Sequence, residues 1–148
     1  MLSFEQIVDK IDQLEEAKAL IAALQLRLFT VIGKNSLTGK EICRRARTHE
    51  KGTAALLNAL AAMGALRKKG DRYANTSETY KHLCETSKDY KKGMVMLRKE
   101  HRQEWERLLD TVRHGRGVSS IEDEEDDPEY RRLFTWAMHE RSERFSGA

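Results

Sequence analysis

Apolar residues recur along the first thirty residues at a helical spacing close to seven. The repeat consists of Ile7, Leu14, Ile21 and Leu28, with Ile11, Ala17, Leu24 and Val31 between them. Ser3 and Gln6 have the spacing of a capping box, and Gly33 can end a helix. We therefore predict a helix from Phe4 to Val31. Its second half is apolar on nearly every side, which predicts one contact with its own domain and another with a second surface.

Two further helices are predicted between residues 38 and 63. Thr38 is a candidate N-cap with Glu41 three residues later, and it begins a short helix that ends near Ala46. After a turn over 48–53, a helix follows that is apolar around almost its whole circumference. Its apolar residues are Ala54, Ala55, Leu56, Leu57, Ala59, Leu60, Ala61, Ala62 and Met63. Such a helix is expected to be buried on more than one side.

A basic hairpin follows this apolar helix. Gly64 ends the helix, and two short strands are predicted over 65–67 and 72–74. Lys69, Gly70 and Asp71 join the strands, and Gly70 can adopt a positive φ angle there. Three helices followed by a hairpin is the order of a winged helix. The predicted fold class is therefore mainly α, with a winged-helix core and a small β-hairpin.

Helical patterning returns after the hairpin, weakly to Leu83 and clearly from Tyr90. The stripe of this second stretch contains Met94, Leu97, His101, Trp105, Leu108 and Val112. Six acidic residues at 122–127 are predicted to form a solvated linker, and a last helix begins at Pro128. The predicted organisation is an N-terminal dimerisation helix (1–32), a winged-helix core (33–80) and a helical extension (81–148).

Charge leaves a DNA-binding role open as an alternative. The chain has 148 residues, 39% of them hydrophobic, which suits one domain with extensions, and its net charge is only +3. However, residues 34–72 contain ten Lys or Arg and three acidic residues, a local +7. Against DNA recognition, the apolar helix offers little beyond Lys51, Thr53 and Asn58 to read base edges. A nucleic-acid partner is therefore not expected, although a winged-helix transcriptional regulator remains the main alternative.

The sequence gives no sign of a metal site, a disulfide scaffold or a membrane segment. Cys43 and Cys84 have no CxxC partner, and His49, His82 and His114 do not have ligand spacing. The acidic run lacks the glycine turn and spaced acceptors of a calcium loop. The N-terminus does not resemble a secretory signal, and no apolar run approaches the roughly 20 residues that span a bilayer. A cytoplasmic location is expected.

Four blocks carry a resemblance to a known family. They are LRLFTVIGKNSLTGKEICRRA, LLNALAAMGALRKKGDRYANT, EWERLLDTVRHGRG and FTWAMHERSERF. In this order they resemble the N-terminal dimerisation domain of small-molecule O-methyltransferases that use S-adenosylmethionine. That group includes caffeate-type, acetylserotonin, hydroxyneurosporene and polyketide enzymes. Many relatives have Gly and Asp where this chain has Arg27 and Thr30, which we interpret as surface or capping changes.

The resemblance implies a homodimer formed through two helices, 19–29 and 56–63. The implied interface residues are Leu20, Leu24, Leu28, Phe29, Leu56, Leu60 and Met63. The alternative is that these side chains only fill the core of one chain. The dimer interpretation depends on there being more apolar helix surface than one small domain can cover.

The resemblance also implies a role in binding the methyl acceptor. Phe134 and Met138 match the F-x-x-x-M of the family's last N-domain helix, which lines the acceptor pocket. Trp105 is a further candidate, with simple core packing as its alternative. His139 is expected to lie off the face of Phe134 and Met138, and His101 is expected in a core or interface.

No cofactor is expected to bind to this chain alone. None of its nine glycines forms the turn after a strand that a nucleotide-type cofactor requires, and no general base is implied here. In the family, S-adenosylmethionine binds to a Rossmann-like catalytic domain, which is expected to begin where this chain stops, at Ala148. We therefore expect a non-catalytic domain that dimerises such an enzyme and closes its pocket around a small hydroxylated, aromatic or polyketide-like molecule. A stand-alone dimeric adaptor is a further alternative.

Overall fold

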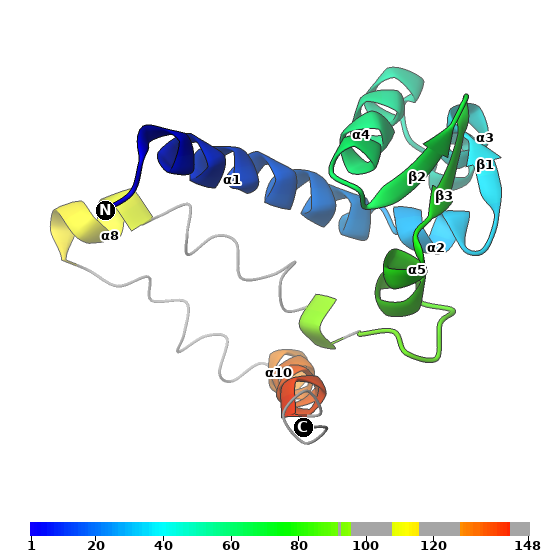
Figure 1. Cartoon of the computed structure of the whole chain (residues 1–148). Coiled ribbons are helices and arrows are strands. Elements are labelled where there is room, and N and C mark those ends of the chain that lie inside the picture. Colours follow the sequence, from blue (N-terminus) through cyan, green and yellow to red (C-terminus); the bar gives the residue numbers. More distant parts are fainter. Residues whose placement is uncertain (92, 96–107, 116–127, 143–148) are drawn as a thin grey trace. The chain divides into compact units, whose positions relative to one another are not determined.

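The computed structural model describes residues 1–91, 93–95, 108–115 and 128–142. The chain divides into two compact units, Met1–Tyr90 and Lys91–Ala148, and each is described by itself. Helices dominate both, and the first unit also contains a small antiparallel sheet (Figure 1). The predicted fold class, a mainly helical chain with a winged-helix core, is confirmed.

Helix α1 (Phe4–Gln25) is the longest described element, and the predicted capping box begins it. The Ser3 hydroxyl accepts the Gln6 N–H while the Gln6 side chain accepts the Ser3 N–H. The prediction of a continuous helix to Val31 is wrong. Arg27 adopts a left-handed conformation, with φ of 54°, and separates α1 from α2 (Leu28–Ile32). Apolar spacing gives no sign of such a break, because one left-handed residue changes the chain direction without changing which residues are apolar.

The core of the first unit lies where α2, α3 (Gly39–Ala46) and α4 (Glu50–Ala62) meet. Its largest fully buried side chains in these helices are Leu28, Phe29, Ile32, Ile42, Leu57 and Leu60. The predicted capping box of Thr38 and Glu41 begins α3. The break after α1 therefore has a packing consequence, because it turns three apolar residues of α2 into this core.

The sheet has three strands rather than the predicted two. Strand β3 (Arg72–Asn75) lies between β1 (Ser36–Thr38) and β2 (Leu66–Lys69), and both pairings are antiparallel. Gly70 has the expected positive φ of 61° in the turn of the β2–β3 hairpin. Strand β1 was missed because three residues are too short to show an alternating pattern.

A buried amide joins this sheet to the end of α2. The Asn75 side chain donates to the backbone oxygens of Phe29 and Gly33, both at 2.8 Å. Asn75 is buried, so these bonds satisfy two carbonyls in a region with little access to water. Helix α5 (Ser77–Leu83) follows β3 directly, capped by Thr76.

In the second unit, the described helical residues are 93–95, α8 (Leu108–His114) and α10 (Pro128–Ser142). Helix α10 begins at Pro128, as predicted. The predicted stripe from Tyr90 is described only in part, since Leu97, His101 and Trp105 lie outside the described residues, as does the acidic run. Three apolar side chains are buried here: Val95, Leu133 and Ala137.

Candidate functional site

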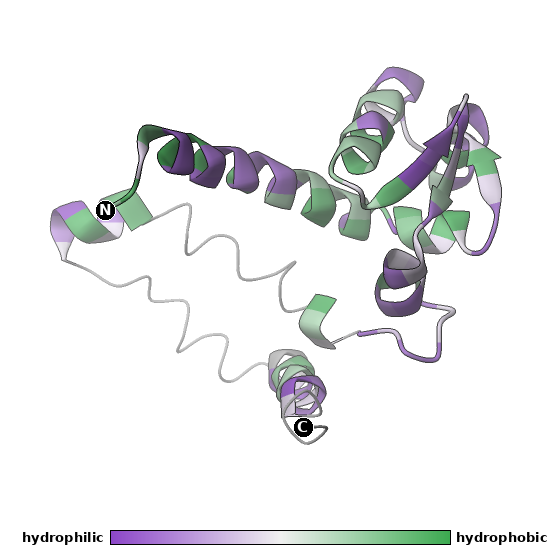
Figure 2. Cartoon of the chain, in the orientation of Figure 1, coloured by the Kyte–Doolittle hydropathy of each residue, from purple (hydrophilic) through white to green (hydrophobic). Residues whose placement is uncertain are grey.

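The first half of α1 presents an apolar face that the described residues of the first unit leave exposed. Its large side chains on this face are between 37% and 80% exposed, namely Phe4, Ile7, Val8, Ile11 and Leu14. Steps of three and four residues place them on one side of the helix. Toward the other end of α1, Ala23 is fully buried. Figure 2 shows hydrophobic and hydrophilic residues alternating along this helix. The helix is therefore packed at one end and open along its apolar side at the other.

Helix α4 is covered on one side only. Thr53, Leu57 and Leu60 are buried against the core, whereas the outward face consists largely of small apolar residues. The exposed alanines are Ala54, Ala55, Ala59 and Ala62. The described residues of the first unit thus bury this helix on one side, not on the several sides that its apolar circumference predicts. A smooth alanine surface remains for another contact.

The structure places the predicted interface residues in two groups. Leu28, Phe29 and Leu60 are buried in the core of a single chain, so their burial needs no partner. The others are half-buried and pack around that core: Leu20, Leu24, Leu56 and Met63. More exposed apolar residues of the first unit lie earlier in α1, among them Phe4, Ile11 and Leu14. The seven-residue spacing of Ile7 and Leu14 was the signal that could have identified them.

Two of the three predicted acceptor-contacting residues lie in the described part of α10. Phe134 is 45% exposed and Met138 37% exposed, and they are four residues apart on one face. Leu133 and Ala137 are buried on a neighbouring face of the same helix. His139 is exposed. Trp105 lies outside the described residues.

The side chains suited to base reading are mostly engaged within the chain. Thr53 is buried, and its hydroxyl donates to the His49 backbone oxygen at 2.9 Å. The Asn58 amide oxygen accepts from the ammonium of Lys68 at 2.7 Å and the hydroxyl of Tyr73 at 2.8 Å. Of the predicted set, Lys51 alone has no such contact in the described structure.

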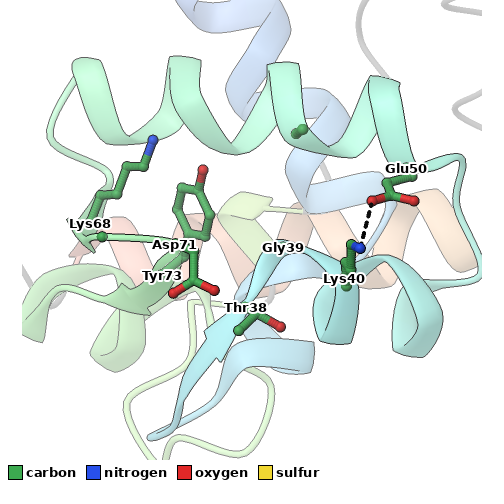
Figure 3. A pocket seen from close by; sticks show the side chains of 9 residues that line it. Thr38, Gly39, Lys40, Glu50, Lys68, Asp71 and Tyr73 are labelled. Carbon is green, nitrogen blue, oxygen red and sulfur yellow. Dashed lines mark ion pairs between the residues drawn. The ribbon is translucent and has the colours of Figure 1, made fainter.

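A pocket of about 600 Å³ opens beside the hairpin, between β3, α3 and the start of α4 (Figure 3). Lys40 and Lys68 line it together with Glu50 and Asp71. Lys40 also forms an ion pair with Glu50 at 3.9 Å. The charges in this pocket balance, so it lacks the single-sign field that concentrates phosphate or another anion.

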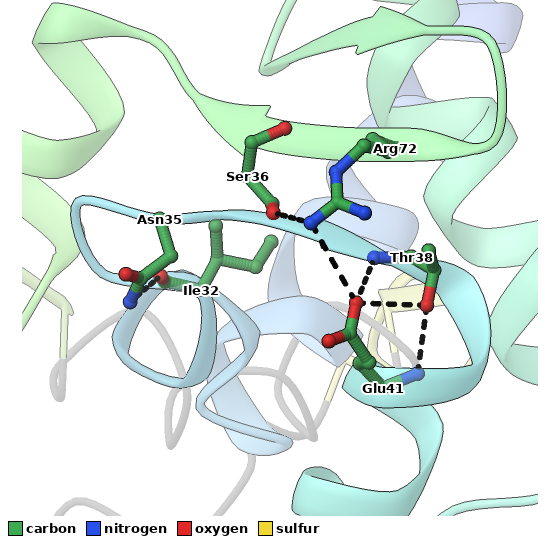
Figure 4. Close-up of polar contacts among 6 residues, drawn as sticks. All are labelled: Ile32, Asn35, Ser36, Thr38, Glu41 and Arg72. Atoms are coloured by element: carbon green, nitrogen blue, oxygen red, sulfur yellow. Dashed lines mark hydrogen bonds and ion pairs between the residues drawn. The ribbon is translucent and has the colours of Figure 1, made fainter.

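The cap of α3 is also an electrostatic junction (Figure 4). The Glu41 carboxylate accepts the Thr38 N–H at 2.7 Å and the Thr38 hydroxyl at 2.9 Å. Arg72 of β3 approaches the same carboxylate at 3.9 Å. The Thr38 backbone bond, then the Thr38 hydroxyl and the charges of Arg72 and Arg45, lower the pKa of Glu41. This junction stabilises the fold and shows no geometry for chemistry.

Within the described ranges, no three His, Cys, Asp or Glu side chains are grouped so that they can hold a metal ion. Over the same ranges, none of the helices has the length and apolar character to cross a bilayer. The candidate functional features of the described ranges are therefore three helix faces: the apolar face of α1, the alanine face of α4 and the face of α10 that carries Phe134 and Met138.

Comparisons with known proteins give one family. A family model described as the O-methyltransferase dimerisation domain matches residues 8–83. The tetracenomycin polyketide synthesis 8-O-methyl transferase TcmO of Streptomyces glaucescens is 35% identical over 101 residues, which is 67% of this chain and 30% of that protein. The N,N-dimethyltransferase OxyT of Streptomyces rimosus is 30% identical over 108 residues, 72% of this chain and 31% of that protein.

Solved structures agree. An O-methyltransferase family protein from Burkholderia thailandensis superposes with a TM-score of 0.82 at 28% identity, over 98% of this chain and 44% of that one. Human N-acetylserotonin methyltransferase, solved with S-adenosylmethionine, has a TM-score of 0.75 at 20% identity, over 93% of this chain and 45% of that one, and shows the fold alone. The chain spans about a third of the length of the curated relatives it matches.

Proposed function

The chain belongs to the O-methyltransferase dimerisation domain family, and we propose that it pairs two copies of a methyltransferase through α1 and α4. One observation carries this proposal: the apolar face of α1, from Phe4 to Leu14, is exposed in the described first unit, although that unit has its own core. The alanine face of α4 adds a surface on which a second helix can pack closely.

Burial of the apolar α1 faces can supply enough free energy to hold two copies together. Full burial of one large apolar side chain contributes about 1.5–3 kcal/mol, and each copy brings five such side chains on α1. Association costs about 4–15 kcal/mol in lost freedom. Even partial burial of the α1 face on two copies therefore offsets that cost.

Sedimentation equilibrium of the chain at micromolar concentration tests the pairing. We expect a dimer, and we expect Ile11→Asp to give a folded monomer, because Ile11 is 60% exposed and is not among the residues that pack on the described core. Gln13→Asp is the matched control, since it adds the same charge about 200° around the helix axis. A wild-type chain that stays monomeric, or an Ile11→Asp chain that stays dimeric, contradicts the proposal.

We further propose that Phe134 and Met138 contact the methyl acceptor in the full-length enzyme. Both side chains are partly exposed on one face of α10, and both match the family's acceptor-lining pattern. Apolar walls of this kind orient a flat molecule and keep water from the transfer step. Trp105 remains a candidate for the same wall. S-adenosylmethionine supplies the methyl group and would be held outside this chain, where a general base would also lie.

The acceptor that we propose is a small hydroxylated molecule, aromatic or polyketide-like. The TcmO relative supports oxygen as the methylated atom, and its identity to this chain is higher than that of the N,N-dimethyltransferase. The described geometry favours this function over that of a winged-helix regulator. Thr53 and Asn58 form hydrogen bonds within the chain, and the outward face of α4 consists largely of alanine.

Kinetics of the full-length methyltransferase test the acceptor role. Phe134→Ala should raise the KM for the acceptor more than the KM for S-adenosylmethionine, because the contact that we propose for this side chain is with the acceptor. His139→Ala is the matched control, an exposed residue one position beyond Met138 on the same helix. An unchanged acceptor profile in Phe134→Ala removes this residue from the site.

A further inference from the structure

A pair of hydrogen bonds within the second unit joins the 93–95 segment to α10 across a long sequence separation. Glu140 accepts the Gly93 N–H through Oε1 at 3.1 Å and the Met94 N–H through Oε2 at 2.9 Å. Both carboxylate oxygens are thus used on neighbouring backbone donors. Bonds to an ionised acceptor are stronger than neutral ones, and a negative charge is favourable where a helical segment begins.

The same two segments also touch backbone to backbone. Gly93 is buried, and a Cβ atom placed on it would lie 2.5 Å from the Ala137 nitrogen and 2.8 Å from the Trp136 carbonyl carbon. Both distances are shorter than real Cβ contacts, and the opposing atoms are backbone atoms that cannot swing away. Glycine is therefore required at 93 for this approach. The contact fixes the distance between the segments, while Glu140 fixes their register.

These contacts lie on the side of α10 next to the proposed acceptor face. Leu133, Ala137 and Glu140 follow one another at steps of four and three, which places them on one stripe. Phe134 and Met138 each follow a member of this stripe by one position, about 100° around the axis. Whatever holds the stripe in place therefore sets the direction of Phe134 and Met138.

We infer that Glu140 and Gly93 are positioning residues for the acceptor-contacting face of α10. This inference rests on the proposed function of Phe134 and Met138. Glu140 acts through the helix rather than on the acceptor: it locks the rotation and register of α10 against the 93–95 segment. Neither Gly93 nor Glu140 stands out in the sequence, since they lie 47 residues apart.

Methyl NMR of the chain tests the structural part. Glu140→Gln keeps the size of the side chain but replaces one accepting oxygen with an NH2 donor, so it cannot offer a separate oxygen to each of the two N–H groups. With 13C-labelled methionine, we expect the methyl resonances of Met94 and Met138 to move. In a separate measurement, we expect hydrogen exchange of the Gly93 and Met94 amides to become faster. Met63 of the first unit should not move. Gly93→Ala should move the same resonances, and Gly52→Ala is its matched control, because a Cβ at Gly52 meets nothing within 4 Å.

Kinetics of the full-length enzyme test the functional part. Glu140→Gln should raise the acceptor KM by about tenfold, with kcat and the cofactor KM unchanged within about twofold. The reason is that a small rotation or shift of α10 displaces Phe134 and Met138, which are proposed to orient the acceptor. A purely structural loss would instead lower kcat through the fraction of folded enzyme. Gly93→Ala should act in the same direction.

Comparing Phe134→Ala with Glu140→Gln distinguishes a failure of the positioning role from a failure of the proposed function. If Phe134→Ala raises the acceptor KM and Glu140→Gln does not, the positioning role is overturned while the proposed function stands. If Phe134→Ala has no effect, the proposed acceptor contact fails. Unmoved Met94 and Met138 resonances in Glu140→Gln overturn the positioning role whatever the kinetics show.

Discussion

Arg27 and Glu85 form an ion pair that holds the junction between α1 and α2 to the segment after α5. Arg27 Nε donates to Glu85 Oε1 at 2.9 Å, and its Nη2 donates to Oε2. Glu85, chiefly through these hydrogen bonds and then through its charge, raises the pKa of Arg27. The Glu85 N–H also donates to the Thr30 hydroxyl at 3.1 Å. Arg27 and Thr30 therefore meet on one partner, Glu85.

This pairing predicts a contrast between two substitutions of Arg27. Both Arg27→Ala and Arg27→Gly lose the ion pair, but only glycine adopts the left-handed backbone without a steric penalty. We expect Arg27→Gly to be more stable than Arg27→Ala by about 1 kcal/mol. Urea unfolding followed by circular dichroism measures the difference. Equal stabilities, or a more stable alanine variant, would contradict a left-handed residue at 27.

A second prediction separates core from surface on α4. Leu60 is fully buried in one chain and Ala59 is exposed beside it. Leu60→Asp should unfold the first unit, because it buries an unpaired charge. Ala59→Asp should leave each chain folded and weaken the dimer, because it places charge on the alanine face. Circular dichroism with sedimentation velocity distinguishes them; a folded Leu60→Asp chain would contradict the core, and a fully dimeric Ala59→Asp chain would contradict the α4 interface.

Much of the first unit could be predicted because local sequence rules determined it. Ser3 with Gln6 and Thr38 with Glu41 form the expected capping boxes, and Gly70 forms the expected hairpin turn. Each of these features depends on residues within three positions of one another. The winged-helix order followed from combining them with the apolar spacing.

The features that were missed depend on tertiary context. The left-handed Arg27 is favoured by a partner 58 residues away, and no local pattern marks a non-glycine residue for that conformation. Strand β1 exists because Leu37 pairs with Tyr73 of β3. Similarly, Gly93 contacts Trp136 and Ala137 of α10, which lie far from it in the sequence, so that no pattern of residue spacing predicts the contact. At the candidate site, the helix that carries Phe134 was predicted, whereas the residue that fixes its direction was not.

A third prediction concerns the buried amide of Asn75. Asn75→Ala should lower the free energy of unfolding by about 1–3 kcal/mol, because the part-buried Gly33 carbonyl loses the donor from Asn75 and the Phe29 carbonyl keeps only the Gly33 N–H. Asn35→Ala is the matched control, since Asn35 is exposed and makes a single bond of 3.2 Å to the Ile32 oxygen. Its cost should be below about 1 kcal/mol. Chemical denaturation of both variants measures the costs, and similar values for the two would contradict the structural role of Asn75.

The last prediction follows from the carboxylate at the start of α3. Because its bonds to Thr38 lower the pKa of Glu41 below the ordinary 4.5, the folded state binds this proton less readily than the unfolded state does. The stabilisation is therefore fully present above about pH 5 and is lost as the pH falls through the lowered pKa. Glu41→Gln cannot titrate, so the stability difference between wild type and this variant should shrink as the solution is acidified. Urea unfolding at several pH values between about 2 and 7 measures it. A difference that stays constant across this range would mean that Glu41 gains nothing from its charge, and that the cap works through hydrogen-bond geometry alone.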